Sequence, residues 1–339
     1  MAFYDSIGGE VKKFALPSMY NYLYSVLSLL NVRDYAAFSD WRIAVYSGLG
    51  GSQLVLNDSD KQFLFEQFFF GYKLMNNVKL ISELPEEQRV PYIQLGGMAF
   101  YYASYSFAAC FIYLHNRSVL ATHSKTYRNY DIVCDKLAFP FNVTFQYDNA
   151  SWNTYQIING SSEFPPTFTY DRQILNRTAL DGFDYKSGVL SYLIGTNRWY
   201  WEESPLFKEA MKEVRRTGYQ NFRTIAARQI RDTYFSRMPN ANYLSCLYRL
   251  RGKINYRDSL FSLYDLRNMG FNTYAKATRL LDVMLEVLKY FSLDIEAYFK
   301  VRLMGNNFHK NMLEDMITQT AGFSFSFPEF QKNLFYPTT

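Results

Sequence analysis

No Asp, Glu, Lys or Arg occurs between Arg89 and Arg117, and this long uncharged segment restricts the fold more than any other feature. A helix of that length and polarity lies either in a bilayer or inside a protein core. The segment contains five tyrosines, two glycines, a proline and a glutamine, and it lacks the long Leu, Ile and Val runs of a membrane span. This composition favours the core. We therefore predict a buried helix over 96–116, and no membrane association.

Apolar residues recur every three or four positions in several other segments, which is the periodicity of a helix. The predicted helices cover 17–31, 58–80, 203–216, 221–235 and 272–304. The last is the longest, and its apolar positions are Ala277, Leu280, Leu281, Met284, Leu288, Phe291, Ile295 and Phe299. These patterns predict a mainly α fold, a helical bundle with a small β-rich insertion.

Two segments are rich in β-forming residues. Residues 41–58 contain two short runs around a cluster of glycines, which predicts a hairpin or a loop. No Lys-Ser/Thr pair follows the glycines, so a turn is favoured over a phosphate-binding loop. Residues 139–169 alternate β-formers with turn residues and predict an inserted hairpin or small sheet. The predicted regions are an N-terminal helical region (1–90), a bundle (91–138 and 200–304), a β-rich insertion (139–199) and an irregular tail (305–339).

The composition is typical of a folded protein of a reducing compartment. The 339 residues are 48% hydrophobic and 19% aromatic, enough to build a large core. Cys110, Cys134 and Cys246 are odd in number and match no metal-binding spacing. The N-terminal segment lacks the apolar run of a signal peptide. We expect a cytoplasmic protein without a metal or cofactor.

Positive charge is concentrated in one part of the chain. The net charge is only +5, but nine arginines and one lysine lie between Arg215 and Arg257, against a single acid, Asp232. Arginine forms bidentate contacts with phosphate, so this region is either a nucleic-acid contact or a solvated helix face. Its last part, YRLRGKINYRDSLF (248–261), precedes the longest predicted helix.

Three segments in this order resemble the HEPN superfamily of helical bundles. They are the Tyr- and Ala-rich helix GMAFYYASYSFAACFIYLHN, the connector THSKTYRNY, and LYRLRGKINYRDSLF before a long helix. The resemblance covers about 98–130 and 244–303. It implies a role in bacterial anti-phage defence or a toxin–antitoxin system, a nucleic-acid or protein partner, and pairing of two bundles as a homodimer. In nuclease members of the superfamily, an Arg and a His with four to six residues between them cleave RNA without a metal.

The arginine-rich segment matches this pattern only in part. Arg249 takes the Arg position and Tyr256 the Tyr position, but Ile254 falls where the His belongs. Isoleucine cannot transfer a proton, so a degenerate site that contacts nucleic acid is expected here. The predicted nucleic-acid-binding residues are Arg249, Arg251, Lys253, Tyr256 and Arg257.

Two other Arg/His pairs have a suitable spacing for proton transfer by His and charge stabilisation by Arg. They are Arg302 with His309, which share a face if the last helix continues, and Arg117 with His123, which do not. The function predicted is a HEPN-like protein that contacts nucleic acid, RNA rather than DNA, or a partner enzyme. The alternative is a metal-independent endoribonuclease that uses one of these two pairs, with Arg302 and His309 preferred.

Overall fold

The structure is a computed structural model that describes residues 15–50, 54–120, 122–152, 154–176, 183–252 and 271–303, with residues 311 and 314. It is mainly α, and its described residues form one two-stranded antiparallel sheet. The predicted fold class is therefore confirmed.

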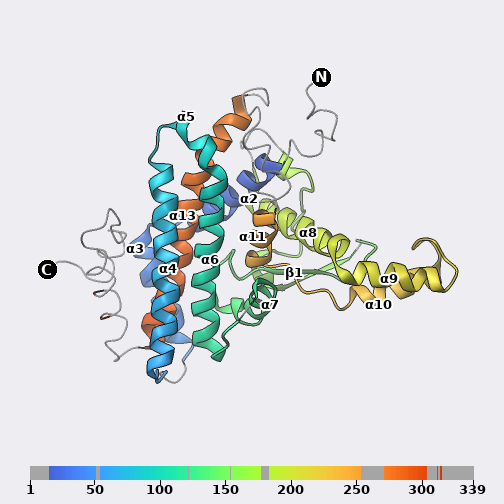
Figure 1. The fold of residues 1–339 in the computed structure, drawn as a ribbon, viewed down its shortest axis with the longest axis horizontal. Helices are drawn as coiled ribbons and strands as arrows, with labels where there is room; N and C mark the ends of the chain where they lie inside the picture. The colour runs from blue at the N-terminus through green and yellow to red at the C-terminus, as the bar shows by residue number, and fades with distance from the viewer. Residues whose placement is uncertain are drawn as a thin grey trace.

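Three long helices lie side by side and form one layer, at the left of Figure 1. They are α4 (Asp58–Ser82), α6 (Ile93–Asn116) and α13 (Phe271–Arg302). The predicted buried helix is confirmed as α6, which begins three residues earlier than expected and buries Phe100, Phe107 and Phe111 completely. Among the described residues, 86–116 is the one helical stretch long and apolar enough to cross a membrane, and 78% of its most apolar window is buried inside the protein.

A capping box begins α4. The side chain of Asn57 accepts from the Asp60 backbone N–H (2.8 Å), and the Asp60 carboxylate accepts from the Asn57 backbone N–H (2.9 Å). Such reciprocal bonds satisfy two N–H groups that the first helical turn leaves free. Further along α4, Gly71 allows close approach to α6, because a Cβ there would lie 2.8 Å from the ring of Phe107.

Residues 41–58 do not form the predicted hairpin, because 41–48 belong to a helix. This helix is α3 (Tyr35–Gly48). Asp34 caps its N-terminus, where the Asp34 side chain accepts from the backbone N–H of Ala37 (2.8 Å). Phe38, Arg42 and Tyr46 are four residues apart and are all buried, and α3 packs against α13. Packing of this face outweighs the weak β-propensity of the Ile, Val and Tyr residues in the segment.

A buried ion pair joins α3 to α13. Asp294 is fully buried, and its carboxylate accepts from Arg42 Nε (2.5 Å), from the hydroxyl of Tyr46 (2.8 Å) and from the backbone N–H of Ala138 (2.7 Å). The guanidinium of Arg42, only 3% exposed, also donates to the carbonyl of Lys136. Every charge here has hydrogen-bond partners, as burial requires.

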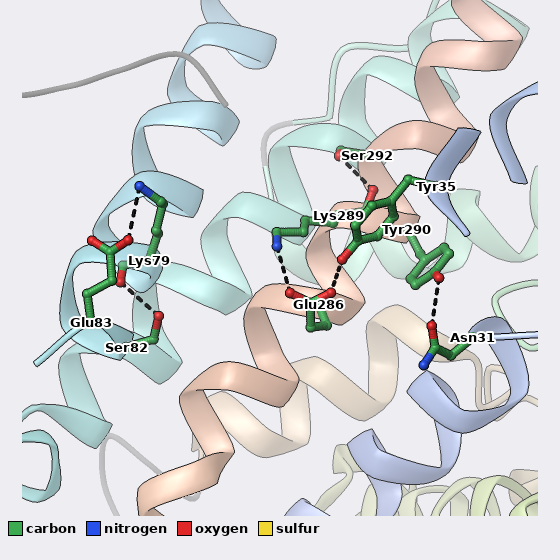
Figure 2. A network of polar contacts seen from close by, with 9 residues as sticks. All are labelled: Asn31, Tyr35, Lys79, Ser82, Glu83, Glu286, Lys289, Tyr290 and Ser292. Carbon is green, nitrogen blue, oxygen red and sulfur yellow. Dashed lines mark hydrogen bonds and ion pairs between the residues drawn. The ribbon is translucent and has the colours of Figure 1, made fainter. Parts of the chain in front are cut away.

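A second set of polar contacts holds the junction of α2 (Ala15–Leu30) and α3 on α13 (Figure 2). The hydroxyl of Tyr290 lies 3.0 Å from Asn31 Oδ1. The hydroxyl of Tyr35 donates to Glu286, whose carboxylate also accepts from Lys289 Nζ (2.6 Å). The rings of Tyr35 and Tyr290 are 5.0 Å apart, so polar and aromatic contacts act together.

The predicted hairpin is confirmed as β1 (Thr144–Tyr147) and β2 (Tyr155–Asn159), which pair antiparallel. The rest of the predicted β-rich insertion (139–199) is not β-rich. It contains most of a long helix, α8 (Tyr185–Glu203), which was not predicted from the sequence. This helix packs on α2, where a Cβ at Gly188 would lie 2.1 Å from Ser25 Oγ. A helix that is buried along much of its length has weak amphipathic periodicity, which explains the error.

The remaining helices lie beside the layer of α4, α6 and α13. They are α7 (His123–Val133), α9 (Pro205–Arg216), α10 (Ile225–Phe235) and α11 (Tyr243–Gly252). Short turns connect the elements: α5 (Glu86–Arg89) and the 3-10 turns η2 (Val90–Tyr92), η3 (Cys134–Lys136), η4 (Ser161–Glu163) and η5 (Ile174–Asn176). Helices α9 and α10 pack on each other and project from the body as an arm, at the right of Figure 1.

Candidate functional site

A group of aromatic and cationic side chains gathers where α6, α7 and α11 pack together (Figure 1). We call it the His123–Arg251 cluster; its members are Tyr101, Tyr102, Tyr105, His123, Tyr248 and Arg251. Helical spacing explains the local arrangement. Tyr101 and Tyr105 are four residues apart on α6, and Tyr248 and Arg251 are three apart on α11, so each pair shares one helix face.

His123 begins α7 and is surrounded by tyrosines. Its ring centroid lies 4.5 Å from that of Tyr105 and 5.4 Å from that of Tyr101. Its Nδ1 lies 2.9 Å from the hydroxyl of Tyr101, which fixes the orientation of the imidazole. Burial, and then the positive charge of Arg251, lower the pKa of His123. The imidazole is therefore neutral at neutral pH and able to accept a proton.

Arg251 lies over the same tyrosines. Its guanidinium carbon is 5.5 Å from the ring centroid of Tyr101, 5.6 Å from that of Tyr102 and 5.9 Å from that of Tyr248. Its Nε is buried without a hydrogen-bond partner, and no carboxylate pairs with the guanidinium in the described part of the chain. Cation–π contacts are worth about 0.5–2 kcal/mol each and do not use the N–H donors of the guanidinium. The arrangement can therefore accept an anion.

Arg249 points to a different place, because residues two apart on a helix face different directions. Its guanidinium carbon lies 5.2 Å from the ring of Tyr192, and its NH1 donates to the Thr196 hydroxyl (3.3 Å). A Cβ at Gly195 would meet the same guanidinium at 3.0 Å. Arg249 thus packs against α8, and of the two predicted nucleic-acid-binding residues that the structure describes, Arg251 joins the cluster and Arg249 does not. The other three, Lys253, Tyr256 and Arg257, lie outside the described residues.

The predicted pair Arg117 and His123 is not brought together by any described contact. Arg117 ends α6 in the left-handed conformation (φ 59°) and pairs with Asp60 Oδ2 (2.8 Å). It also donates to the carbonyl of Val55 (2.7 Å). These contacts tie α6 to the start of α4, whereas His123 contacts the tyrosines of the cluster.

The other predicted pair cannot be placed, because His309 lies outside the described residues. Arg302 is the last residue of α13, and its carbonyl accepts from the backbone N–H of Leu54 (3.0 Å). Its guanidinium carbon lies 5.9 Å from the ring of Tyr298. The proposed use of Arg302 and His309 in proton transfer stays a prediction.

The cysteines are packing residues. All three are buried and form no disulfide. Burial raises the pKa of each thiol, that of Cys246 to about 11, so none is a reactive thiolate at neutral pH. Within the described ranges, no group of three or more His, Cys, Asp or Glu residues is arranged to hold a metal ion.

Sequence reasoning placed His123 and Arg251 in different candidate sites, and it did not select the tyrosines of α6 as contact residues. The local signal existed, since the Tyr-rich helix and the connector with His123 were both noted. The pairing of His123 with an arginine more than a hundred residues away required the packing of α7 and α11 on α6.

Comparison with protein-family models, with curated protein sequences and with solved structures found no match for this chain. The resemblance to the HEPN superfamily therefore stays a prediction, as do the defence context, the homodimer and the cytoplasmic location.

Proposed function

We propose that this protein binds RNA at the His123–Arg251 cluster. The observation that supports this proposal is that a neutral histidine and an arginine without a carboxylate partner among the described residues lie on the same tyrosine rings. A half-buried guanidinium attracts an anion strongly, because water screens its charge less than on an open surface. Phosphate suits such a site, since the planar guanidinium donates two parallel hydrogen bonds to it.

The tyrosines give the site a second chemical character. Tyr102, Tyr105 and Tyr248 are half-buried, so each keeps some contact with solvent. Accessible aromatic rings next to a cation are the usual elements of single-stranded RNA recognition, with bases stacked on rings and the backbone held by arginine. We therefore expect a single-stranded segment, with a phosphate at Arg251 and a neighbouring base against a tyrosine ring.

The binding experiment uses a fluorescent RNA tetranucleotide in EDTA. Arg251→Gln should weaken binding about tenfold or more, since the charge-assisted hydrogen bonds that it removes contribute about 1.5–3 kcal/mol. Arg33→Gln is the matched control, because Arg33 is an exposed arginine that also lies over an aromatic ring, Trp41, at 4.3 Å. Equal affinities for the wild type and the Arg251 variant would contradict the proposed site.

A second proposed function is metal-independent cleavage of the bound RNA, which the proximity of His123 to Arg251 favours. In this reaction, Nε2 of His123 accepts the proton of a ribose 2′-OH while Nδ1–H donates to Tyr101. The 2′-oxygen forms a bond to the adjacent phosphorus, and the bond from phosphorus to the 5′-oxygen breaks. The leaving 5′-oxygen takes a proton from water, and Arg251 stabilises the negative charge on the phosphoryl oxygens.

Cleavage is tested with end-labelled RNA in EDTA, followed by analysis of the product ends. The expected products carry 2′,3′-cyclic phosphate and 5′-hydroxyl ends, and a DNA of the same sequence stays intact because it lacks the 2′-OH. His123→Ala should abolish cleavage, whereas His115→Ala, which changes an exposed histidine of α6, should not. Cleavage that survives His123→Ala would reject the enzymatic proposal and leave the binding proposal standing.

A further inference from the structure

The arm formed by α9 and α10, residues 205–237, carries a net positive charge. It contains eight Lys or Arg against three Asp or Glu, an excess of five, which equals the net charge of the whole protein (+5). Two of the acids are already paired within the arm: Glu213 with Arg216 (3.2 Å) and Asp232 with Arg231 (2.8 Å). The remaining cations give the arm a positive surface.

The arm has a small apolar centre of its own, which turns its charged side chains outward. Phe207 of α9 packs edge-on against Phe222 (ring centroids 5.9 Å apart), and Trp201 at the base packs against Phe207 and Phe235. Ala210 is completely buried between the helices. An amphipathic helix with its apolar face against a partner necessarily presents its polar face to solvent.

A hollow of about 580 Å³ runs along the outer face of α9. It is lined by Phe207, Lys208, Met211, Lys212, Arg215 and Arg216. Lys208, Lys212 and Arg215 follow each other at intervals of four and three residues, so they form one exposed row. None of the three has an ion-pair partner among the residues that the structure describes. The half-buried side chains of Phe207 and Met211 supply an apolar surface between the cations.

We infer that this face of the arm is a second RNA-binding surface, which holds the phosphates of a single strand. The row of cations matches a polyanion, and two arginines, Arg215 and Arg216, line the same hollow. Phe207 offers a ring for base stacking, which sequence-independent binding of single strands uses. A lipid bilayer fits less well, because Phe207 and Met211 are half-buried and are not fully exposed apolar side chains.

The arm is connected to the His123–Arg251 cluster through α8. Tyr200, near the end of α8, stacks on Tyr248 of the cluster (ring centroids 6.2 Å apart, planes at 11°), and α9 begins five residues later at Pro205. The exposed carboxylates of Glu202 and Glu203 lie at the junction. The arm and the cluster are therefore two separate phosphate-binding regions of one RNA-binding protein, and this inference rests on the proposed function for its ligand class.

The test measures how RNA affinity depends on salt concentration, with oligonucleotides of about four and about thirty nucleotides, at the lower end of and well above the size of a single-strand binding site. The arm variant is Lys208→Gln, Lys212→Gln and Arg215→Gln together. For the long RNA, the slope of log binding constant against log salt concentration should be shallower by about 2 in this variant. The reason is that the variant loses three cations, and each phosphate contact to a single strand contributes about 0.7 to the slope. Tetranucleotide binding should not change.

The control variant is Lys61→Gln, Lys73→Gln and Lys79→Gln, which removes three charges from α4 at the opposite side of the molecule (Figure 1). It should leave both slopes as in the wild type, and both variants should keep the wild-type thermal unfolding midpoint. An unchanged slope for the arm variant with long RNA overturns the inference. Loss of binding to phosphatidylserine vesicles without any change in RNA binding overturns it too, and makes the arm a membrane contact.

The two proposals fail in different ways. If long RNA binds through the arm but the tetranucleotide does not bind, the His123–Arg251 proposal is wrong and the arm inference stands. If the tetranucleotide binds and the arm variant behaves as the wild type, the reverse holds. If neither the tetranucleotide nor the long RNA binds, both proposals are wrong.

Discussion

Loss of the buried carboxylate of Asp294 should destabilise the protein severely. Asp294 is fully buried and accepts three hydrogen bonds, one of them from Arg42, which is itself only 3% exposed. Asp294→Ala would leave the guanidinium buried with one backbone carbonyl, that of Lys136, and the aromatic faces of Trp41 and Tyr46. An unpaired buried charge of this kind costs about 3–5 kcal/mol.

The measurement is urea-induced unfolding, followed by far-UV circular dichroism and by tryptophan fluorescence. The double variant Arg42→Met with Asp294→Leu separates the charge effect from the loss of packing. It removes both charges, so its destabilisation should be clearly smaller than the sum for the single variants Arg42→Met and Asp294→Leu. It should stay less stable than the wild type, because the Tyr46 hydroxyl and the Ala138 backbone N–H lose their acceptor. Glu83→Ala, which breaks the exposed pair with Lys79, is the control and should change the free energy by less than about 1 kcal/mol.

Two results would refute this reasoning. One is an Asp294→Ala protein whose free energy of unfolding lies within about 1 kcal/mol of the wild type, which would mean that water reaches Arg42. The other is a double variant whose destabilisation equals the sum of the two single changes, which would mean that the two side chains do not interact.

Three further predictions concern packing and pH. Ala108→Arg should unfold the protein, a loss of more than about 3 kcal/mol, because Ala108 is fully buried, whereas Ala109→Arg, at a half-buried position, should be much milder in thermal unfolding. Gly188→Ala should lower the free energy of unfolding by about 1–3 kcal/mol, because its Cβ would lie 2.1 Å from a serine hydroxyl of α2. Gly48→Ala, with open space around its Cβ, should raise it by up to about 1 kcal/mol. The pKa of His123 is lower in the folded protein than in the unfolded chain, so the unfolded chain binds a proton at this histidine more readily as the pH falls. Protonation of His123 therefore lowers the free energy of unfolding below about pH 6.5 and has no effect well above it. His123→Asn should therefore reduce the decline in the unfolding midpoint below pH 6.5, and an equal decline in both proteins would contradict the assigned environment.

Helix periodicity in the sequence was enough to predict the fold class and most of the long helices. The uncharged segment that became α6 and the long apolar repeat of α13 were predicted because each pattern is local and regular. The same local reasoning was wrong for α3, where Ile43, Val45 and Tyr46 suggested a strand. It also missed α8, because a helix buried along much of its length lacks a clear polar face.

The sequence by itself determined that the fold is mainly α, which faces of the predicted helices are apolar, and that positive charge is concentrated between Arg215 and Arg257. Only the tertiary structure decided how that charge is used. It places Arg251 on the tyrosines beside His123, turns Arg249 toward α8 and presents Arg215 and Arg216 on an exposed arm. The physical reason is that helix periodicity acts over a few residues, whereas a site depends on which faces meet, and long-range packing of the whole chain selects those contacts.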